Sequence, residues 1–344
     1  MYFKKTFLKD LKPSSFKIDS SGQVFVNTEG RIIVFDQDYN DNVFLESNSV
    51  KITIILNDYI WVGDTHNGQT SIYNKRGLIS TLNFVATIPN GKVDSFLTNR
   101  YIYPKIYINR DFSDFYYARI SINDYSESDL LKGNFASNNI SLIVNDDAYI
   151  SSNKEKIGLF DFDKELIWQN SFIGLSNSDR AVLHSKVLNS HNKLFFVITG
   201  NKNKGLYVLD VHIGELLKKF GEVCYEIFQD GDYIFSSRFE NILCRINTKT
   251  LELDEWDCNS LIKTNGFDAI HDHRCAALNN KFYFTQSLGD NKAKVGVLDW
   301  DTKDLVYKHE FDPENGAIGS IQVNESRMFI HTQDNTLHIF EKEA

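Results

Sequence analysis

The chain has 344 residues, a formal net charge of −9 and a hydrophobic content of 42%. The negative charge opposes nonspecific binding to nucleic acid or anionic lipid, since both reward clustered lysine and arginine. No apolar run approaches the roughly 20 residues of a membrane span, and the start, MYFKKTFLKDL, lacks the apolar centre of an export signal. We therefore expect a soluble, cytoplasmic protein that contacts neither nucleic acid nor membrane.

Short alternating strands in groups of four fill the chain from its start. The first group is expected at Ser15–Ile18, Gln23–Thr28, Arg31–Phe35 and Val43–Glu46. Seven more groups follow, and their loops are mostly too short to hold a helix. They are expected at Lys51–Phe84, from Val93 through a third strand at Phe115–Asn123, and at Ile140–Phe172, Lys193–Phe220, Tyr225–Trp256, Arg274–Phe311 and Ile318–Glu341.

The fifth group shows the repeat most clearly. Apolar residues run from Leu194 to Ile198, a polar loop follows, and a strand ends at Asp210 before a turn through Gly214. A short carboxylate can accept backbone N–H groups two residues on, and glycine reaches positive φ without steric cost. A polar residue of this kind is therefore expected to end the third strand of each group.

Two sets of markers recur at a spacing of roughly forty residues, which is typical of propeller blades. The strand-ending markers are Asp36, Asn74, Asn123, Asp161, Asp210, Asn247, Asp299 and Glu341. The hairpin markers are Ser21-Gly22, Asn57-Asp58, Asn99-Arg100, Asp146-Asp147, His191-Asn192, Asp230-Gly231, Asn279-Asn280 and Glu325-Ser326. The sequence thus predicts an all-β fold, a single β-propeller of eight four-stranded blades, with seven blades as the alternative.

The last group supplies only three strands, Ile318–Val323, Arg327–Thr332 and Thr336–Glu341. The segment Tyr2–Phe7 has the character of an outer strand and is expected to pair there, which would cover an otherwise exposed sheet edge. No linker rich in proline, glycine or serine separates the repeats. Residues 1–344 are therefore expected to form one domain.

The segments Asp210-Val-His-Ile-Gly214-Glu215 and Leu166-Ile167-Trp168 resemble the quinoprotein-like (PQQ-like) and WD40-like propeller repeats. The resemblance implies an architecture shared by enzymes, assembly factors and scaffolds, so it implies no activity. The chain departs from the quinone enzymes because it has no adjacent cysteine pair and only four tryptophans. No cofactor is expected.

Few motifs point to catalysis. The sequence contains no Walker loop, GxGxxG after a strand, HExxH or GxSxG. The segment His271-Asp272-His273 is the one cluster with metal-ligand residue types, and alternate positions on a strand would place both imidazoles on one side. A solvated polar loop is nevertheless the favoured explanation, because short-motif matches have a low base rate. The four cysteines lack CxxC spacing and are expected to be buried thiols.

Loops remain as the candidate site. In a propeller, the loops before the first strand and between the second and third strands emerge at the same end of the blades, and arginine and aromatic residues favour interface cores. The expected partner-binding residues are Asp64, His66, Arg110, Asp111, Phe112, Arg238, Phe239 and Arg274, with Lys202 and Lys204 nearby. The sequence favours a non-catalytic protein that captures a protein partner on this end, in a narrower form an inhibitor or immunity-type factor. The alternative is a metal-assisted hydrolase or lyase that uses His271 and His273.

Overall fold

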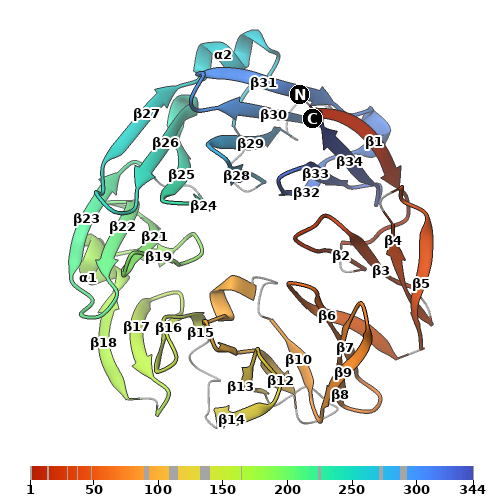
Figure 1. The fold of residues 1–344 in the computed structure, drawn as a ribbon. Helices are drawn as coiled ribbons and strands as arrows, with labels where there is room; N and C mark the ends of the chain where they lie inside the picture. The colour runs from red at the N-terminus through yellow and green to blue at the C-terminus, as the bar shows by residue number, and fades with distance from the viewer. Residues whose placement is uncertain are drawn as a thin grey trace. The chain divides into compact units, whose positions relative to one another are not determined.

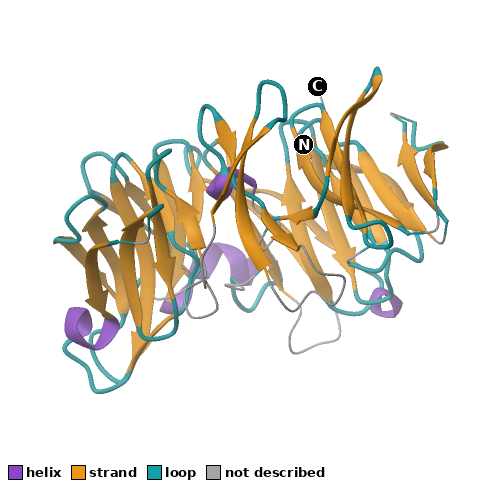
Figure 2. Cartoon of the chain, turned by 90° about the horizontal axis from the view of Figure 1, so that it is seen from below, coloured by secondary structure: helices purple, strands orange, loops and turns teal. Residues whose placement is uncertain are grey.

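In the computed structural model the chain forms two compact units. Unit 1 comprises Met1–Pro13, Lys154–Lys156 and Asn170–Ala344, and unit 2 comprises Ser14–Asn153 and Ile157–Gln169. Figure 1 shows the elements of both, and Figure 2 shows that strands dominate them. The structure describes residues 2–13, 15–28, 30–36, 38–47, 49–88, 93–107, 115–131, 140–163, 165–223, 226–270, 274–286 and 293–343.

Unit 2 contains four antiparallel sheets. The first sheet is β2 (Phe16–Ile18), β3 (Val24–Thr28), β4 (Arg31–Phe35) and β5 (Asp41–Glu46). The second is β6 (Val50–Leu56), β7 (Tyr59–Asp64), β8 (Gln69–Asn74) and β9 (Gly77–Leu82). The third is β10 (Val85–Thr87), β11 (Tyr101–Ile102), β12 (Lys105–Tyr107), β13 (Phe115–Ser121) and β14 (Glu127–Leu131), and the fourth is β15 (Ile140–Ile143), β16 (Ala148–Ser152), β17 (Lys156–Asp161) and β18 (Leu166–Ser171).

Unit 1 contains four more sheets. The first is β19 (Ala181–Leu183), β20 (Leu188–Ser190), β21 (Lys193–Gly200), β22 (Gly205–Asp210) and β23 (Leu216–Gly221). The second is β24 (Phe228–Asp230), β25 (Tyr233–Arg238), β26 (Ile242–Asn247) and β27 (Leu253–Asp257). The third is β28 (Ala276–Leu278), β29 (Lys281–Gln286), β30 (Lys294–Asp299) and β31 (Asp304–Glu310), and the fourth is β32 (Ile318–Val323), β33 (Arg327–Thr332), β34 (Leu337–Lys342) and β1 (Tyr2–Leu8).

These eight sheets are the blades of an eight-bladed β-propeller, and the seven-blade alternative is wrong. In the described residues the helices are short connections: α1 (Phe172–Ser176), α2 (Asn259–Thr264) and the 3₁₀ turns η2 (Val93–Phe96), η4 (Phe239–Asn241) and η5 (Pro313–Asn315). The turn residues act as predicted, since the Asp210 carboxylate accepts the N–H groups of His212 at 2.8 Å and Ile213 at 3.2 Å. Gly214 has the positive φ, 70°, that this turn requires.

The third sheet of unit 2 corrects one expected boundary. The segment from Val93 is a 3₁₀ turn rather than a strand, and the innermost strand of that sheet is β10, which pairs with β12. Val93 and Phe96 are three residues apart, a spacing that puts both on one side of a 3₁₀ turn. Phe96 is thereby buried and stacks on Tyr117 with ring centroids 6.1 Å apart.

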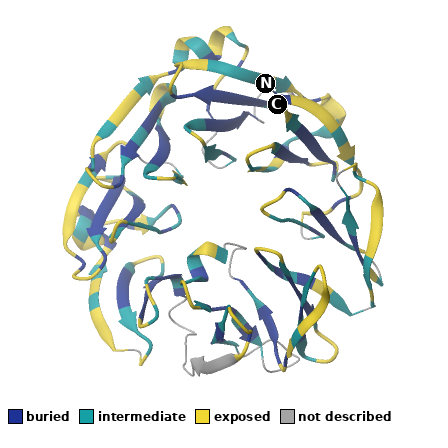
Figure 3. Cartoon of the chain, viewed as in Figure 1, coloured by how far each residue is buried: buried dark blue, intermediate teal, exposed yellow. Residues whose placement is uncertain are grey.

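Apolar clusters fill the spaces between consecutive sheets of unit 1. One joins β21 and β22 to β25 and β26, the next joins β25 and β26 to β29 and β30, and a third joins β29 and β30 to β33 and β34. Figure 3 shows the middle strands of each sheet largely buried and the outer strands more exposed. The prediction of buried thiols is confirmed for Cys244, Cys258 and Cys275, whereas Cys224 lies outside the described residues.

Strand β1 completes the last sheet by pairing antiparallel to β34, in a register from Tyr2 opposite Lys342 to Leu8 opposite Leu337. Tyr2 is buried, and its hydroxyl lies 2.9 Å from the Tyr283 hydroxyl of the neighbouring sheet. His331 on β33 also binds this segment, through Nε2 to the Leu11 carbonyl at 2.6 Å. The expected pairing of the N-terminal segment is therefore confirmed.

Candidate protein-binding loops

In unit 1 the predicted loops emerge at the same end of their sheets. The Thr285 hydroxyl near the end of β29 donates to the Arg274 carbonyl at 3.0 Å, so the segment before β28 lies beside the β29–β30 connection. In the preceding sheet the Ser236 hydroxyl donates to the Glu226 carbonyl in the same way. Lys202, Lys204, Arg238, Phe239 and Arg274 thus lie at one end of three consecutive blades, which we call the loop end of unit 1.

Phe239 is the most exposed aromatic side chain of this loop end, with 53% of its surface accessible. The Lys204 ammonium group lies 4.5 Å from its ring centroid. A cation at this distance from an aromatic face is attracted by the ring quadrupole. Lys204 and Phe239, from neighbouring blades, therefore form a small surface with one charged and one apolar side chain.

The backbone that carries Phe239 is braced. Glu240 and Asn241 both adopt positive φ, 65° and 62°, which turns the chain sharply between β25 and β26. The Asn241 amide oxygen accepts the Ile270 N–H at 2.9 Å, and its amide nitrogen donates to Asn259 Oδ1 at 3.0 Å. Side-chain hydrogen bonds to the next connection therefore hold the loop, and Phe239 is presented from a defined position rather than from a free strand end.

Arg238 is already engaged within the chain. Its guanidinium forms an ion pair with Glu255 at 2.5 Å and lies 3.7 Å from Glu222. A partner that binds Arg238 would have to displace Glu255 from the guanidinium, or bind Arg238 while the ion pair with Glu255 stays intact. Sequence reasoning missed Glu222, Glu255 and Asn241, because nothing in a single sequence marks which acid or amide on another strand will reach a given loop.

Asp64 and His66 lie in unit 2, at the end of β7 and in the loop that follows. The Asp64 carboxylate accepts the backbone N–H groups of His66 at 2.9 Å and Asn67 at 3.1 Å, and the Ser49 hydroxyl at 2.8 Å. Burial raises the pKa of Asp64, but these hydrogen bonds outweigh it and leave the pKa below its ordinary value. Its carboxylate therefore shapes the turn, which is sufficient reason for an aspartate at this position.

The remaining predicted site residues, Arg110, Asp111, Phe112, His271, Asp272 and His273, lie outside the described residues. Within the described part of the chain, no group of three histidine, cysteine, aspartate or glutamate side chains could hold a metal ion. The proposed metal ligands His271 and His273 stay a prediction.

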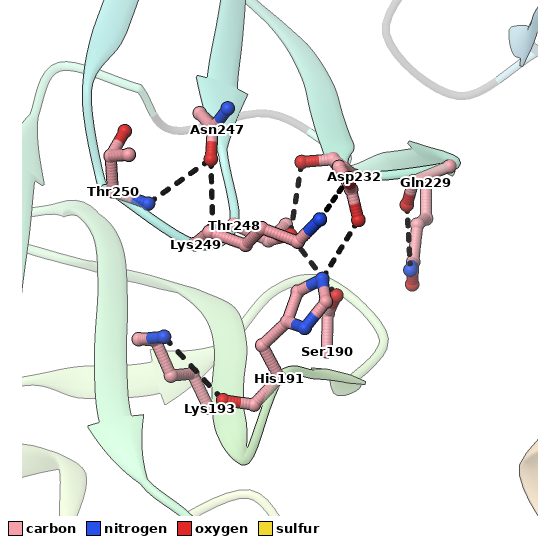
Figure 4. A network of polar contacts seen from close by, with 10 residues as sticks. Ser190, His191, Lys193, Gln229, Asp232, Asn247, Thr248, Lys249 and Thr250 are labelled. Atoms are coloured by element: carbon pink, nitrogen blue, oxygen red, sulfur yellow. Dashed lines mark hydrogen bonds and ion pairs between the residues drawn. The ribbon is translucent and has the colours of Figure 1, made fainter.

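The opposite ends of the blades carry a polar network (Figure 4). His191 Nε2 lies 2.8 Å from Asp232 Oδ1, the Lys249 ammonium lies 2.6 Å from Asp232 Oδ2, and the Ser190 hydroxyl donates to Thr248 Oγ1 at 3.1 Å. Hydrogen bonds from Lys249 and His191 hold the pKa of Asp232 below its ordinary value. The network is contributed by the hairpin of one blade and the turns of the next.

This arrangement repeats along unit 1. The Asn280 N–H donates to Asp230 Oδ2 at 2.8 Å, and the Asn279 amide donates to Glu325 Oε2 at 2.7 Å. Unit 2 has a counterpart in which Arg100 Nε donates to Asp146 Oδ2 at 2.7 Å. Several residues of the hairpin markers therefore also form hydrogen bonds to the next blade. Their suitability for turns does not predict these contacts.

Neither family models nor curated proteins match this sequence. Among solved structures, Sqt1 from Saccharomyces cerevisiae is similar with a TM-score of 0.60 and 11% identity, covering 99% of both chains. BamB from Moraxella catarrhalis is similar with a TM-score of 0.55 and 9% identity, covering 99% of this chain and 100% of its own. The Dos1 propeller, at a TM-score of 0.55 and 13% identity, covers 99% of this chain and 95% of its own.

These likenesses confirm, at the level of the fold, the resemblance to PQQ-like and WD40-like propellers that the repeats suggest. At such low identities they say nothing of a partner or an activity. No helix in the described residues is long and apolar enough to cross a membrane.

Proposed function

We propose that this chain is a non-catalytic propeller that binds a protein partner at the loop end of its blades. The observation that supports the proposal best is Phe239, an exposed aromatic side chain on a braced loop beside Lys204. A rigidly held aromatic residue loses little conformational freedom on binding, and such residues dominate the energetics of protein interfaces. We further propose that residues 1–344 act as one domain in the cytoplasm.

The test replaces Phe239 with a photo-crosslinking phenylalanine analogue and identifies the captured protein from native cells. Ile213, 63% exposed in the turn at the opposite ends of the strands of its blade, is the matched control position. With the purified partner, Phe239→Ala should weaken binding by about tenfold or more, whereas Ile213→Ala should have little effect. Both side chains are exposed, so neither change should lower stability by more than about 0.5 kcal/mol. Equal losses for both variants, or none for Phe239→Ala, would contradict the proposal.

The narrower form, an inhibitor or immunity-type factor that neutralises a basic protein, rests on the net charge of −9. It requires a partner with a basic surface and an association rate that falls steeply as salt is raised, since salt screens long-range attraction. Stopped-flow measurements at low and physiological salt would decide, because an association rate insensitive to salt excludes this form while leaving the binding proposal intact.

A further inference from the structure

A cavity of 280 Å³ in unit 1 lies between strand β1, the turn η5 and the hairpin between β33 and β34. It lies at the same end of the strands as the loop end of unit 1, in the following blade, and shares none of the residues named there. Its volume is slightly below the roughly 300 Å³ at which pockets for drug-sized ligands begin, and charged side chains line much of it. A ligand would therefore have to be small and held mainly by charge and hydrogen bonding.

One wall of the cavity is positive. Lys4 and Lys9 place their ammonium groups 5.4 and 5.6 Å from the centroid of the Phe7 ring, and neither forms an ion pair within the described residues. Lys5, by contrast, lies 3.6 Å from the Glu341 carboxylate. Two uncompensated cations that contact the same ring form a favourable position for a carboxylate.

Another part of the lining, which we call the negative wall, carries acidic side chains. Asp312 and Glu314 flank Pro313 at η5, are exposed, and have no ion pair in the described part of the chain. Asp334 also lines the cavity, but its carboxylate is already bonded, accepting from the Thr332 and Thr336 hydroxyls at 2.7 Å each and from the Asn315 amide at 2.9 Å. Asp334 therefore holds this side of the cavity in place, and Asp312 and Glu314 remain open to a cation.

The third side is uncharged at neutral pH. His338 is 2% exposed, lies opposite Phe7 in the β1–β34 register, and hydrogen-bonds through Nε2 to the Thr332 hydroxyl at 3.0 Å. The Thr332 hydroxyl also lies 2.7 Å from a carboxylate oxygen of Asp334, which can only accept, so the hydroxyl donates there and accepts from Nε2–H. The hydrogen bonds thus place a proton on Nε2, and because burial lowers the pKa of His338 to about 4, the imidazole is an uncharged part of the lining at neutral pH.

We propose that this cavity binds a small zwitterion of amino-acid size, with its carboxylate between Lys4 and Lys9 and its ammonium group at Asp312 and Glu314. The two walls carry opposite charges yet form no ion pair with each other. A molecule that carries both charges compensates both walls at once, whereas a lone anion or cation compensates only one. The Phe7 ring offers an apolar surface to the short alkyl part of such a ligand.

The test is isothermal titration calorimetry at low salt with glycine, β-alanine and γ-aminobutyrate, which separate the two charges by increasing distances. Acetate, methylammonium and inorganic phosphate are the single-charge probes. At least one zwitterion should bind, and the three should differ in affinity because the separation of the walls is set by the fold. Binding of acetate or phosphate as strong as that of the best zwitterion would make this an anion site and overturn the proposal, as would equal binding of methylammonium or no binding at all.

Variants locate the site. Lys4→Gln combined with Lys9→Gln, and separately Glu314→Gln, should each weaken the best zwitterion by about fivefold, equivalent to about 1 kcal/mol. The control Lys5→Gln removes a neighbouring cation of the same strand that does not line the cavity and should leave the affinity unchanged. All four side chains are exposed, and circular dichroism verifies that the variants are folded. Zwitterion binding that survives both cavity changes would place the ligand elsewhere and refute the assignment.

Discussion

Acidification should destabilise the last sheet of unit 1 through His338. Burial and, to a smaller extent, the Lys4 ammonium lower the pKa of this imidazole to about 4, against the opposing effect of Asp334. His309 and His331 lie nearby, and burial also lowers the pKa of His309. The Nδ1 atom of His338 is buried without a hydrogen-bond partner, so no acceptor stabilises a proton on this nitrogen. The folded protein therefore favours neutral His338.

The sign and size of the effect follow from linkage. In the unfolded chain His338 has its ordinary pKa of 6.5, so below that pH the unfolded state binds a proton that the folded state does not. Stability is fully present above pH 6.5 and is lost as the pH falls towards about 4. At about 1.4 kcal/mol per pKa unit, the loss from His338 alone is up to about 2 kcal/mol at pH 5 and up to about 3 kcal/mol near pH 4.

Urea unfolding of the natural protein and of His338→Phe between about pH 7 and pH 5 measures this directly. The variant loses the Thr332 hydrogen bond and is expected to be less stable at pH 7. Its further loss on acidification should be smaller than that of the natural protein by up to about 2 kcal/mol, since it has no proton to bind at this position. Parallel pH profiles for the two proteins would show that His338 is not the group responsible.

Three further predictions concern stability, each measured by thermal or urea unfolding. Deleting residues 2–8 should lower the melting temperature markedly, because the ladder hydrogen bonds of β1 are lost and the buried Tyr283 hydroxyl loses its partner at about 1–3 kcal/mol; an unchanged midpoint would refute this role of β1. Gly296→Ala should cost about 1–3 kcal/mol, since a Cβ there would lie 2.5 Å from the Phe284 ring, and a neutral result would mean that the ring moves freely. Asp210→Ala should cost about 1 kcal/mol through loss of the turn hydrogen bonds, whereas Asp210→Asn should retain most of that stability.

The fold could be predicted from sequence because its signals are local and repeated. Most blades end their third strand with a carboxylate or amide, and side chains such as Asp36, Asn74 and Asp161 make the expected backbone contacts. The markers Asn123, which lies beyond the end of β13, and Glu341, which lies within β34, do not act in this way. The expected start of the third blade at Val93 was wrong because the repeat signal is weak there. An insertion in one blade interrupts the period, and the burial of Phe96 depends on Tyr117 of β13, which follows that insertion in the same blade.

The site was less predictable because it depends on which side chains from different blades meet. Phe239 could be selected as a loop aromatic, but its contact with Lys204 and the brace from Asn241 to Ile270 depend on how neighbouring blades align. Arg238 looked like a free anchor, and its pairing with Glu255 could not be inferred from local sequence. The cavity beside β1 combines residues from both ends of the chain, which no local pattern connects.

The pairing of β1 with β34 has a consequence for the order of folding. Tyr2 and Tyr283, which share a hydrogen bond, are separated by 281 positions, and His331 and Leu11 by 320. A ribosome adding about 5–20 residues per second needs on the order of tens of seconds to supply the partners of the first strand. During that interval Tyr2, Phe3 and Phe7 have no sheet to join, so the nascent chain carries an unpaired, aromatic-rich strand. Pairing over such a sequence separation is slow, and an unpaired aromatic strand is prone to aggregation until its partner strand has been synthesised.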